Sequence, residues 1–338
     1  MTFTVLSDSD IKRLFQGQSS DEVASLTHAL DQALIQYSTQ DEKQYQPHRG
    51  VVTRPGGQVS LFMPATTQYL IGVKIVGITA PALKSALTLC DATGEAVGIV
   101  NAAELTAFRI SLGSMLLYRM RSNTENILVF GAGKQALWHI RLAVLVRGQD
   151  IRTVTVVNRS TQRAQDLVET LTNDPESGWP EHIKLQVFDG NASLETLVVA
   201  ADLLSESART KSRFISAIGS YRLDMTEIDP ELLKEVVNTP GVFSNQVWNG
   251  NIAVDTIDGC LQEAGELVKA GLNPDQMVEI GNLQQARESN SSLELDEWLQ
   301  SGFVIYKSVG IGIMDLAIGH SLLQLASSKG VGLNAEIF

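Results

Sequence analysis

The sequence predicts an α/β fold in which a doubly wound parallel sheet of the Rossmann type is joined to a mixed α+β region. Strands and helices alternate from Ile127 onward, which is typical of doubly wound domains. Residues 126–136 read as a strand, two glycines and a helix, the arrangement of a dinucleotide-binding turn. Before residue 121 the pattern differs, because short strands stand between two helices.

The N-terminal region begins with a predicted helix at residues 19–40, where apolar side chains form one stripe and Ser20 is the predicted N-cap. Period-two runs follow, and the last two flank a hairpin connection at residues 92–95. Helical periodicity returns at residues 102–121. The predicted strands are Val59–Met63, Gly72–Ile78, Ser85–Asp91 and Ala96–Asn101.

The alternating region supplies the parallel sheet. Its turn-rich stretch at residues 173–180 is a predicted loop. The predicted strands and helices are Ile127–Phe130, Lys134–Arg147, Thr153–Val157, Thr161–Thr172, Ile183–Phe188 and Phe214–Ile218, and Ser193–Ala201 and Val242–Ser244 continue the series.

Composition limits the classes of function. The 338 residues are 44% hydrophobic, which allows a real core, and the net charge of -12 gives no electrostatic reason to bind nucleic acid or an anionic membrane. We see no signal peptide and no apolar run of about 20 residues. Cys90 and Cys260 form no disulfide framework, so we expect a cytoplasmic protein. The five histidines are scattered, and no metal site is predicted.

The most informative stretch is Gly131-Ala132-Gly133-Lys134-Gln135-Ala136, a G-x-G-x-x-A fingerprint. Gly131 permits a tight turn, Gly133 lets the backbone approach a pyrophosphate, and Ala136 keeps the helix close to the strand. The helix N-terminus then offers N–H groups to the phosphates. The alternative is a tight βα turn that binds nothing.

The end of the next strand indicates which cofactor binds. NAD sites usually carry Asp or Glu there, whereas this chain has Asn158-Arg159-Ser160. The guanidinium of Arg159 suits a 2′-phosphate, which favours NADP(H) over NAD(H). The alternative is that Arg159 is a solvated surface residue.

These two motifs resemble those of the ornithine cyclodeaminase / mu-crystallin family. The similarity covers nearly the whole chain, and the Arg222-x-Asp224-x-x-Glu227 arrangement is closer to the mu-crystallin / ketimine reductase pattern. The other matching stretches, in the same order, are Gln46–Arg49, Met63–Ala65, Gly72–Lys74, Leu105–Arg109, Gly219–Glu227 and Tyr306–Gly310.

The resemblance implies a domain organisation. A dinucleotide-binding domain at residues 122–305 is expected to lie between two parts of a substrate and dimerisation domain, residues 1–121 and 306–338. It also implies a homodimer that acts on a small amino or imino acid.

The resemblance assigns site residues as well. Lys74 and Asp224 are the expected catalytic residues. A small imino acid needs a cationic clamp, and a partly buried lysine can lose its proton near neutral pH. The alternatives are that the cations are surface residues and that Asp224 caps a helix at residues 225–233. The expected substrate-binding residues are Arg49, Arg109 and Met63, and the expected cofactor-binding residues are Gly131, Ala132, Gly133, Gln135, Ala136, Asn158, Arg159, Ser160, Thr106 and Ser308.

The implied activity is the NAD(P)H-dependent reduction of small amino-acid-derived imines, as by a ketimine or imino-acid reductase or a related amino-acid dehydrogenase. One alternative is ornithine cyclodeaminase, an NAD-dependent lyase that forms proline and ammonia, although the aspartate of the cyclodeaminases is replaced at or near Tyr221. Another is a non-catalytic mu-crystallin-like binding protein.

Three departures from the family bear on activity. Ile110-Ser111-Leu112 stands where the family usually has Thr-Ala-Ala, and Asn101 where it often has Asp. The region 202–213 is shorter than in the family, and its basic residues are expected to be solvated. A shortened loop there could alter substrate choice or abolish activity.

Overall fold

The computed structural model describes residues 3–16, 18–79, 82–173, 178–188, 212–238, 252–290 and 293–336. The chain divides into two compact units, Met1–Gly113 with Gly310–Phe338, and Ser114–Val309. The first limit lies within helix α3 (Ala102–Tyr118). Both limits differ by a few residues from the predicted domain boundaries, and the role predicted for each domain stays a prediction.

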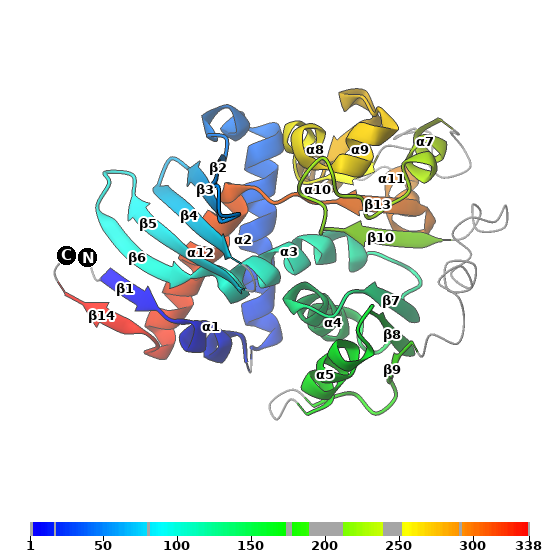
Figure 1. Ribbon diagram of the computed structural model, residues 1–338, viewed down its shortest axis with the longest axis horizontal. Coiled ribbons are helices and arrows are strands. Elements are labelled where there is room, and N and C mark those ends of the chain that lie inside the picture. Colours follow the sequence, from blue (N-terminus) through cyan, green and yellow to red (C-terminus); the bar gives the residue numbers. More distant parts are fainter. Residues whose placement is uncertain are drawn as a thin grey trace. The chain divides into compact units, whose positions relative to one another are not determined.

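The first unit contains a seven-stranded sheet in the order β14-β1-β6-β5-β4-β3-β2 (Figure 1). Neighbouring strands are antiparallel except β1 and β6. The four predicted strands and the hairpin are confirmed, whereas the three outer strands were not predicted because they are short. The strands are β1 (Phe3–Leu6), β2 (Gly50–Thr53), β3 (Val59–Thr66), β4 (Leu70–Thr79), β5 (Ala82–Asp91), β6 (Ala96–Asn101) and β14 (Leu333–Ala335).

Helix α12 (Gly312–Lys329) packs on one face of this sheet, against β3, β4, β5 and β6, and α2 (Ser20–Thr39) packs on α12 (Figure 1). The packing is close, since a Cβ added at Gly72 would lie 2.7 Å from Leu316 Cδ1. The N-cap of α2 is Ser19, which forms a capping box with Glu22, so the prediction of Ser20 was one residue late. The unit also contains α1 (Asp8–Phe15) and η1 (Glu42–Tyr45).

The second unit begins its αβ alternation with a three-stranded parallel sheet in the order β7-β8-β9. These elements follow the predicted ones closely, because apolar runs and turn residues mark their ends in the sequence. They are β7 (Asn126–Phe130), α4 (Lys134–Arg147), β8 (Thr153–Val157), α5 (Thr161–Thr172) and β9 (Lys184–Val187).

A four-stranded parallel sheet follows in the order β10-β13-β11-β12, so that the last strand of the unit lies between two earlier ones. The described parallel strands therefore form two hydrogen-bonded sheets within one α/β unit, which confirms the predicted fold class. The elements are β10 (Arg213–Ala217), α7 (Pro230–Asn238), β11 (Ile252–Val254), α8 (Ile257–Glu263), α9 (Gly265–Ala270), η3 (Pro274–Gln276), β12 (Met277–Glu279), α10 (Ile280–Asn290), α11 (Leu293–Ser301) and β13 (Phe303–Lys307).

Some predictions in this unit differ from the structure or lie beyond it. The alternative in which Asp224 caps a helix at residues 225–233 is wrong, because α7 starts at Pro230 and the backbone N–H of Glu231 donates to Asp229 Oδ1 at 2.9 Å. Ser193–Ala201, Val242–Ser244 and most of the short region 202–213 lie outside the described residues. Within the described ranges, no helix has both the length and the apolar character needed to cross a lipid bilayer.

Candidate active site

The turn between β7 and α4 has the shape of a phosphate cradle. Gly131 has a φ of 116°, a conformation that favours glycine, and its N–H donates to Val157 O at 2.8 Å, which ties the turn to the end of β8. Gly133 is the N-cap of α4 and provides no side-chain hydrogen bond. The first N–H groups of α4 are therefore not capped by that residue.

The surroundings of this turn fit the diphosphate of a dinucleotide. A Cβ added at Gly131 or Gly133 would meet no described atom within 4 Å, so both glycines face open space. Ala136 is buried, as the close packing of helix and strand in this fingerprint requires. The buried Gln135 Oε1 accepts no hydrogen bond from the described residues. A ligand in this cradle could supply the missing donor.

Beyond β8, hydrogen bonds shape the turn that carries Arg159. Asn158 Nδ2 donates to Ser160 O at 2.9 Å, and Ser160 Oγ caps α5 by accepting from Arg163 N at 3.4 Å. These contacts leave Arg159 exposed. Arg159 follows the end of β8, where Val157 accepts the hydrogen bond from Gly131. The 2′-phosphate prediction requires an arginine at this position.

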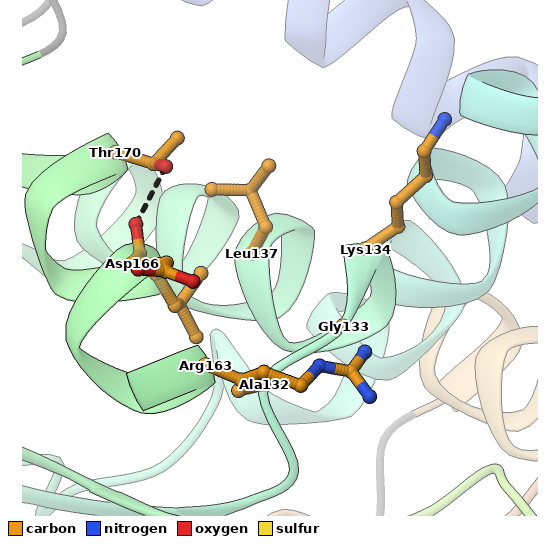
Figure 2. A pocket seen from close by; sticks show the side chains of 8 residues that line it. Ala132, Gly133, Lys134, Leu137, Arg163, Asp166 and Thr170 are labelled. Atoms are coloured by element: carbon orange, nitrogen blue, oxygen red, sulfur yellow. Dashed lines mark hydrogen bonds between the residues drawn. The ribbon is translucent and has the colours of Figure 1, made fainter. Parts of the chain in front are cut away.

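A pocket of about 320 Å³ lies beside α5 in the second unit. One side is formed by the turn between β7 and α4 together with the start of α4, and the other side is one face of α5. Figure 2 shows Arg163 extending from α5 across the Ala132–Gly133 turn. The sequence interpretation missed Arg163. The sequence signal that could have found Arg163 is its position, four residues after Arg159 and in the first turn of the following helix. The pocket is lined by Ala132, Gly133, Lys134, Leu137, Arg163, Asp166, Leu167 and Thr170.

In the first unit, Lys74 and Arg109 converge on one buried carboxylate, that of Asp315 in α12. Lys74 Nζ lies 2.7 Å from Asp315 Oδ2. Arg109 donates to the same carboxylate through Nε at 3.0 Å and Nη2 at 3.2 Å. All three side chains are at most 2% exposed. The sequence interpretation missed Asp315, although an acidic residue among the apolar residues of the last helix was a signal.

The pKa of Lys74 is lowered to about 8. Burial is the main cause, because it disfavours the charged amine, and the positive charge of Arg109 adds to it. Asp315 opposes the shift, and the charge of Arg49 lowers the pKa further. An amine with this pKa can give and take a proton near neutral pH.

The other predicted site residues of the first unit differ in burial and in their contacts. Met63 is buried and lies directly across from Lys74 in the β3–β4 pair. Arg49 is half-buried just before β2. Thr106 donates its hydroxyl to Ala102 O at 2.7 Å, within α3. Met63 therefore faces Lys74 from the neighbouring strand, and the substrate-binding roles of Arg49, Met63 and Arg109, like the cofactor role of Thr106, stay predictions.

Asp224 and Ser308 belong to the second unit, and the roles expected of them stay predictions. The side chain of Asp224 is 71% exposed and pairs with Arg222 at 3.1 Å. Ser308 is buried and donates to Asp255 Oδ2 at 2.7 Å. The carboxylate of Glu227 in the same motif is hydrogen-bonded within the fold. It accepts from Gly219 N at 2.7 Å, Ser220 N at 2.8 Å and Lys307 Nζ at 2.9 Å. The sequence interpretation chose Asp224 and missed Glu227.

Comparisons with known proteins find relatives that extend over most of the chain. No protein-family model matches the chain. The uncharacterized protein YGL159W of Saccharomyces cerevisiae is 24% identical over 97% of this chain and 99% of its own length. A Delta(1)-pyrroline-2-carboxylate reductase of Bacillus cereus is 24% identical over 90% of this chain and 92% of its own length.

Solved structures share the fold over almost the whole chain. The Delta(1)-pyrroline-2-carboxylate reductase of Thermococcus litoralis, in complex with NADH and L-proline, has a TM-score of 0.74 at 17% identity and covers 98% of this chain and 100% of its own. A probable ornithine cyclodeaminase from Bordetella pertussis has a TM-score of 0.70 at 19% identity, with 97% and 99% covered.

The parallel sheets and the glycine turn define a protein with a Rossmann-type α/β unit. The chain is similar in sequence to a Delta(1)-pyrroline-2-carboxylate reductase and in fold to a probable ornithine cyclodeaminase, which agrees with the resemblance seen in its motifs.

Proposed function

We propose that this chain reduces the C=N bond of a small imino acid with a nicotinamide cofactor as the source of hydride. The observation that carries the proposal is a buried amine, Lys74, whose pKa is about 8, in a chain that also has an open dinucleotide turn. The relatives named Delta(1)-pyrroline-2-carboxylate reductase support the same reaction class.

Each residue of the cationic cluster has a proposed role. Lys74 holds or supplies the proton at the substrate nitrogen. Arg49 binds the substrate carboxylate by a charge-assisted hydrogen bond. Two donors of Arg109 are already used by Asp315, so we propose that Arg109 orients the cluster and contributes its charge to substrate binding. Together they position two reactants, which is the main work of such an enzyme.

The direct test is an assay of NADPH oxidation with a panel of 2-oxo acids, amines and cyclic imines. Lys74→Ala should abolish turnover while leaving dinucleotide binding intact, and unchanged turnover would remove Lys74 from the chemistry. Release of ammonia from ornithine without net NADPH consumption would instead identify a lyase. Tight dinucleotide binding without any turnover would identify a binding protein.

We propose further that the cofactor is NADP(H), with Arg159 and Arg163 at its 2′-phosphate. Arg159→Ala should weaken NADPH binding about 10- to 100-fold and NADH binding little, because one charge-assisted contact is lost. Arg152→Ala is the matched control, since this exposed arginine precedes the same strand that Arg159 follows. Equal losses for both coenzymes on Arg159→Ala would contradict the 2′-phosphate role.

The assembly and compartment are also proposals. Outward-facing apolar side chains of the seven-stranded sheet, among them Phe62, Ile71, Ile75 and Ile99, are 37–43% exposed and support a homodimer through this face. Phe62 and Ile75 are direct cross-strand neighbours. The two free cysteines support a reducing compartment such as the cytoplasm.

A further inference from the structure

Two buried cations of the first unit meet at the carboxylate of Asp315. Its Oδ2 lies 2.7 Å from Lys74 Nζ and accepts from Arg109 Nη2 at 3.2 Å, and its Oδ1 accepts from Arg109 Nε at 3.0 Å. One carboxylate of α12 thus joins the amine of β4 to the guanidinium of α3. Because all three side chains are at most 2% exposed, water screens these contacts little.

The guanidinium of Arg109 is held on other sides as well. Gly310 lies so close that an added Cβ would be 2.8 Å from Nη1 and 2.9 Å from Nη2. Nη1 also lies 3.3 Å from the sulfur of Met314, the residue before Asp315 in α12. These contacts leave Arg109 little room to move, so Asp315 sets the distance between Arg109 and Lys74.

Lys74 makes fewer contacts than Arg109. Asp315 is the one hydrogen-bond acceptor of its amine within the described part of the chain, although a charged amine has three hydrogens to donate. The residues directly across from Lys74 in β3 and β5 are Met63 and Leu87, both uncharged. The strands beside Lys74 therefore provide no charge at these positions, and the negative charge comes from α12.

The charged groups that act on Lys74 oppose one another. Burial and the positive charges of Arg109 and Arg49 disfavour its ammonium form, whereas the charge of Asp315 and its hydrogen bond favour it. The charged state of this amine therefore depends on Asp315.

We propose that Asp315 is the positioning residue of this site, which holds Lys74 and Arg109 at a fixed separation and keeps the amine of Lys74 in its charged form. An ammonium group can supply a proton to the nitrogen of an imine, whereas a neutral amine cannot. In that step an N–H bond of Lys74 breaks, one forms at the substrate nitrogen, and the amine regains a proton from solvent. The inference rests on the proposed function in taking Lys74 as the proton donor.

The first test needs neither coenzyme nor substrate. It is NMR of the full chain with ¹³C-labelled lysine and aspartate, in which loss of a signal in Lys74→Met assigns Lys74. The Lys74 Cε signal should titrate near pH 8, and the Asp315 carboxyl signal should change over the same pH range because the two groups share a hydrogen bond. Titration of Lys74 at the ordinary lysine value, with no response of Asp315, would overturn the proposal.

Asp315→Asn removes the charge and keeps the shape of the side chain. An opposite charge nearby shifts a pKa by about one to three units, so Lys74 should titrate at least about one unit lower in this variant. The matched control is Asp8→Asn, whose carboxylate also lies 2.7 Å from a lysine, Lys12, but in a pair that is 40% and 51% exposed. The control should leave the titration of Lys74 unchanged.

Turnover gives a second readout, one that a purely structural role would not produce. With the cyclic imine that wild type reduces fastest, the loss of kcat/KM in Asp315→Asn should be about tenfold greater near pH 9 than near pH 6. The reason is that acid restores the ammonium form of Lys74. An equal loss at every pH would leave Asp315 with a structural role alone.

Asp315→Glu separates position from charge. It keeps the carboxylate on a longer side chain, so the pH dependence should remain that of wild type while kcat/KM falls at every pH, because the two cations are displaced. Full wild-type turnover in Asp315→Glu would contradict the fixed separation.

If Asp315→Asn does not fold, the shared titration of Lys74 and Asp315 in wild type still decides the question. A titration of Lys74 that depends on Asp315, in a chain that reduces no imine, would sustain the position and charge assigned to Asp315 and defeat the proposed function. Imine reduction by a chain in which Asp315→Asn leaves the titration of Lys74 unchanged would do the reverse.

Discussion

Asp315 pairs with two buried cations of the first unit. Its carboxylate meets Lys74 at 2.7 Å and Arg109 at 3.0 Å in a setting from which water is almost excluded. A buried ion pair adds little net stability by itself, but removal of one partner leaves an uncompensated charge. The residue therefore matters for stability and for the state of Lys74.

Asp315→Ala should lower the free energy of unfolding by about 3–5 kcal/mol at neutral pH, because Lys74 and Arg109 lose their common partner. Urea unfolding of the purified variant measures this change. Asp224→Ala is the control, since Asp224 is 71% exposed and its pair with Arg222 should contribute less than about 1 kcal/mol. Similar losses for the two variants would contradict the assignment.

At the scale of elements, His139 joins α4 to its neighbours within the second unit. His139 Nδ1 lies 2.8 Å from Gln135 O, and Nε2 lies 2.9 Å from Ser114 Oγ, which in turn lies 2.7 Å from Ser216 Oγ of β10. A carbonyl can only accept, so Nδ1 donates to it. In the neutral ring Nε2 then accepts from Ser114, and Ser216 donates to Ser114. This chain of bonds is complete with an uncharged imidazole.

The pKa of His139 is lowered to about 4 by burial. Between about pH 6.5 and pH 4 the unfolded chain binds a proton that the folded chain does not, so stability rises with pH across this window. On acidification through it, wild type should lose about 2–3 kcal/mol more than His139→Gln. Urea unfolding at both ends of the window measures the difference.

The same substitution at exposed His28 of α2 controls for the loss of one imidazole. If His139→Gln and wild type lost stability in parallel, His139 would not be neutral in the fold.

At the scale of the whole molecule, the seven-stranded sheet has two unlike faces. Met63, Val76 and Leu87 are buried on the face that α12 covers, whereas Phe62 and Ile75 alternate with them and are exposed. An exposed apolar patch of this kind usually marks an interface. A second copy of the chain is the proposed partner.

Ile75→Glu should convert the proposed dimer to a monomer, because a buried charge without a partner at the centre of an interface is costly. Sedimentation velocity measures the change. Leu293→Glu is the control, since Leu293 is 88% exposed at the start of α11 and belongs to the second unit. A dimer that persists in Ile75→Glu would assign the interface to another surface.

The sequence predicted best the features that depend on neighbouring residues. The glycine turn, the start of α4 at Lys134 and strand β8 match the prediction, because strand, turn and helix signals lie within a few positions of one another. It predicted the cationic residues only through family resemblance. Their shared partner was out of reach, because Asp315 lies 241 positions from Lys74 in the sequence.

The sequence by itself determined the fold class and the dinucleotide fingerprint, since these depend on the period, spacing and type of neighbouring residues. Only the tertiary structure decided which charges meet. It paired Glu227 with Lys307 and brought Asp315 to Lys74 and Arg109. The reason is physical: pairing and desolvation depend on distance and burial, and these exist only once remote segments have packed together.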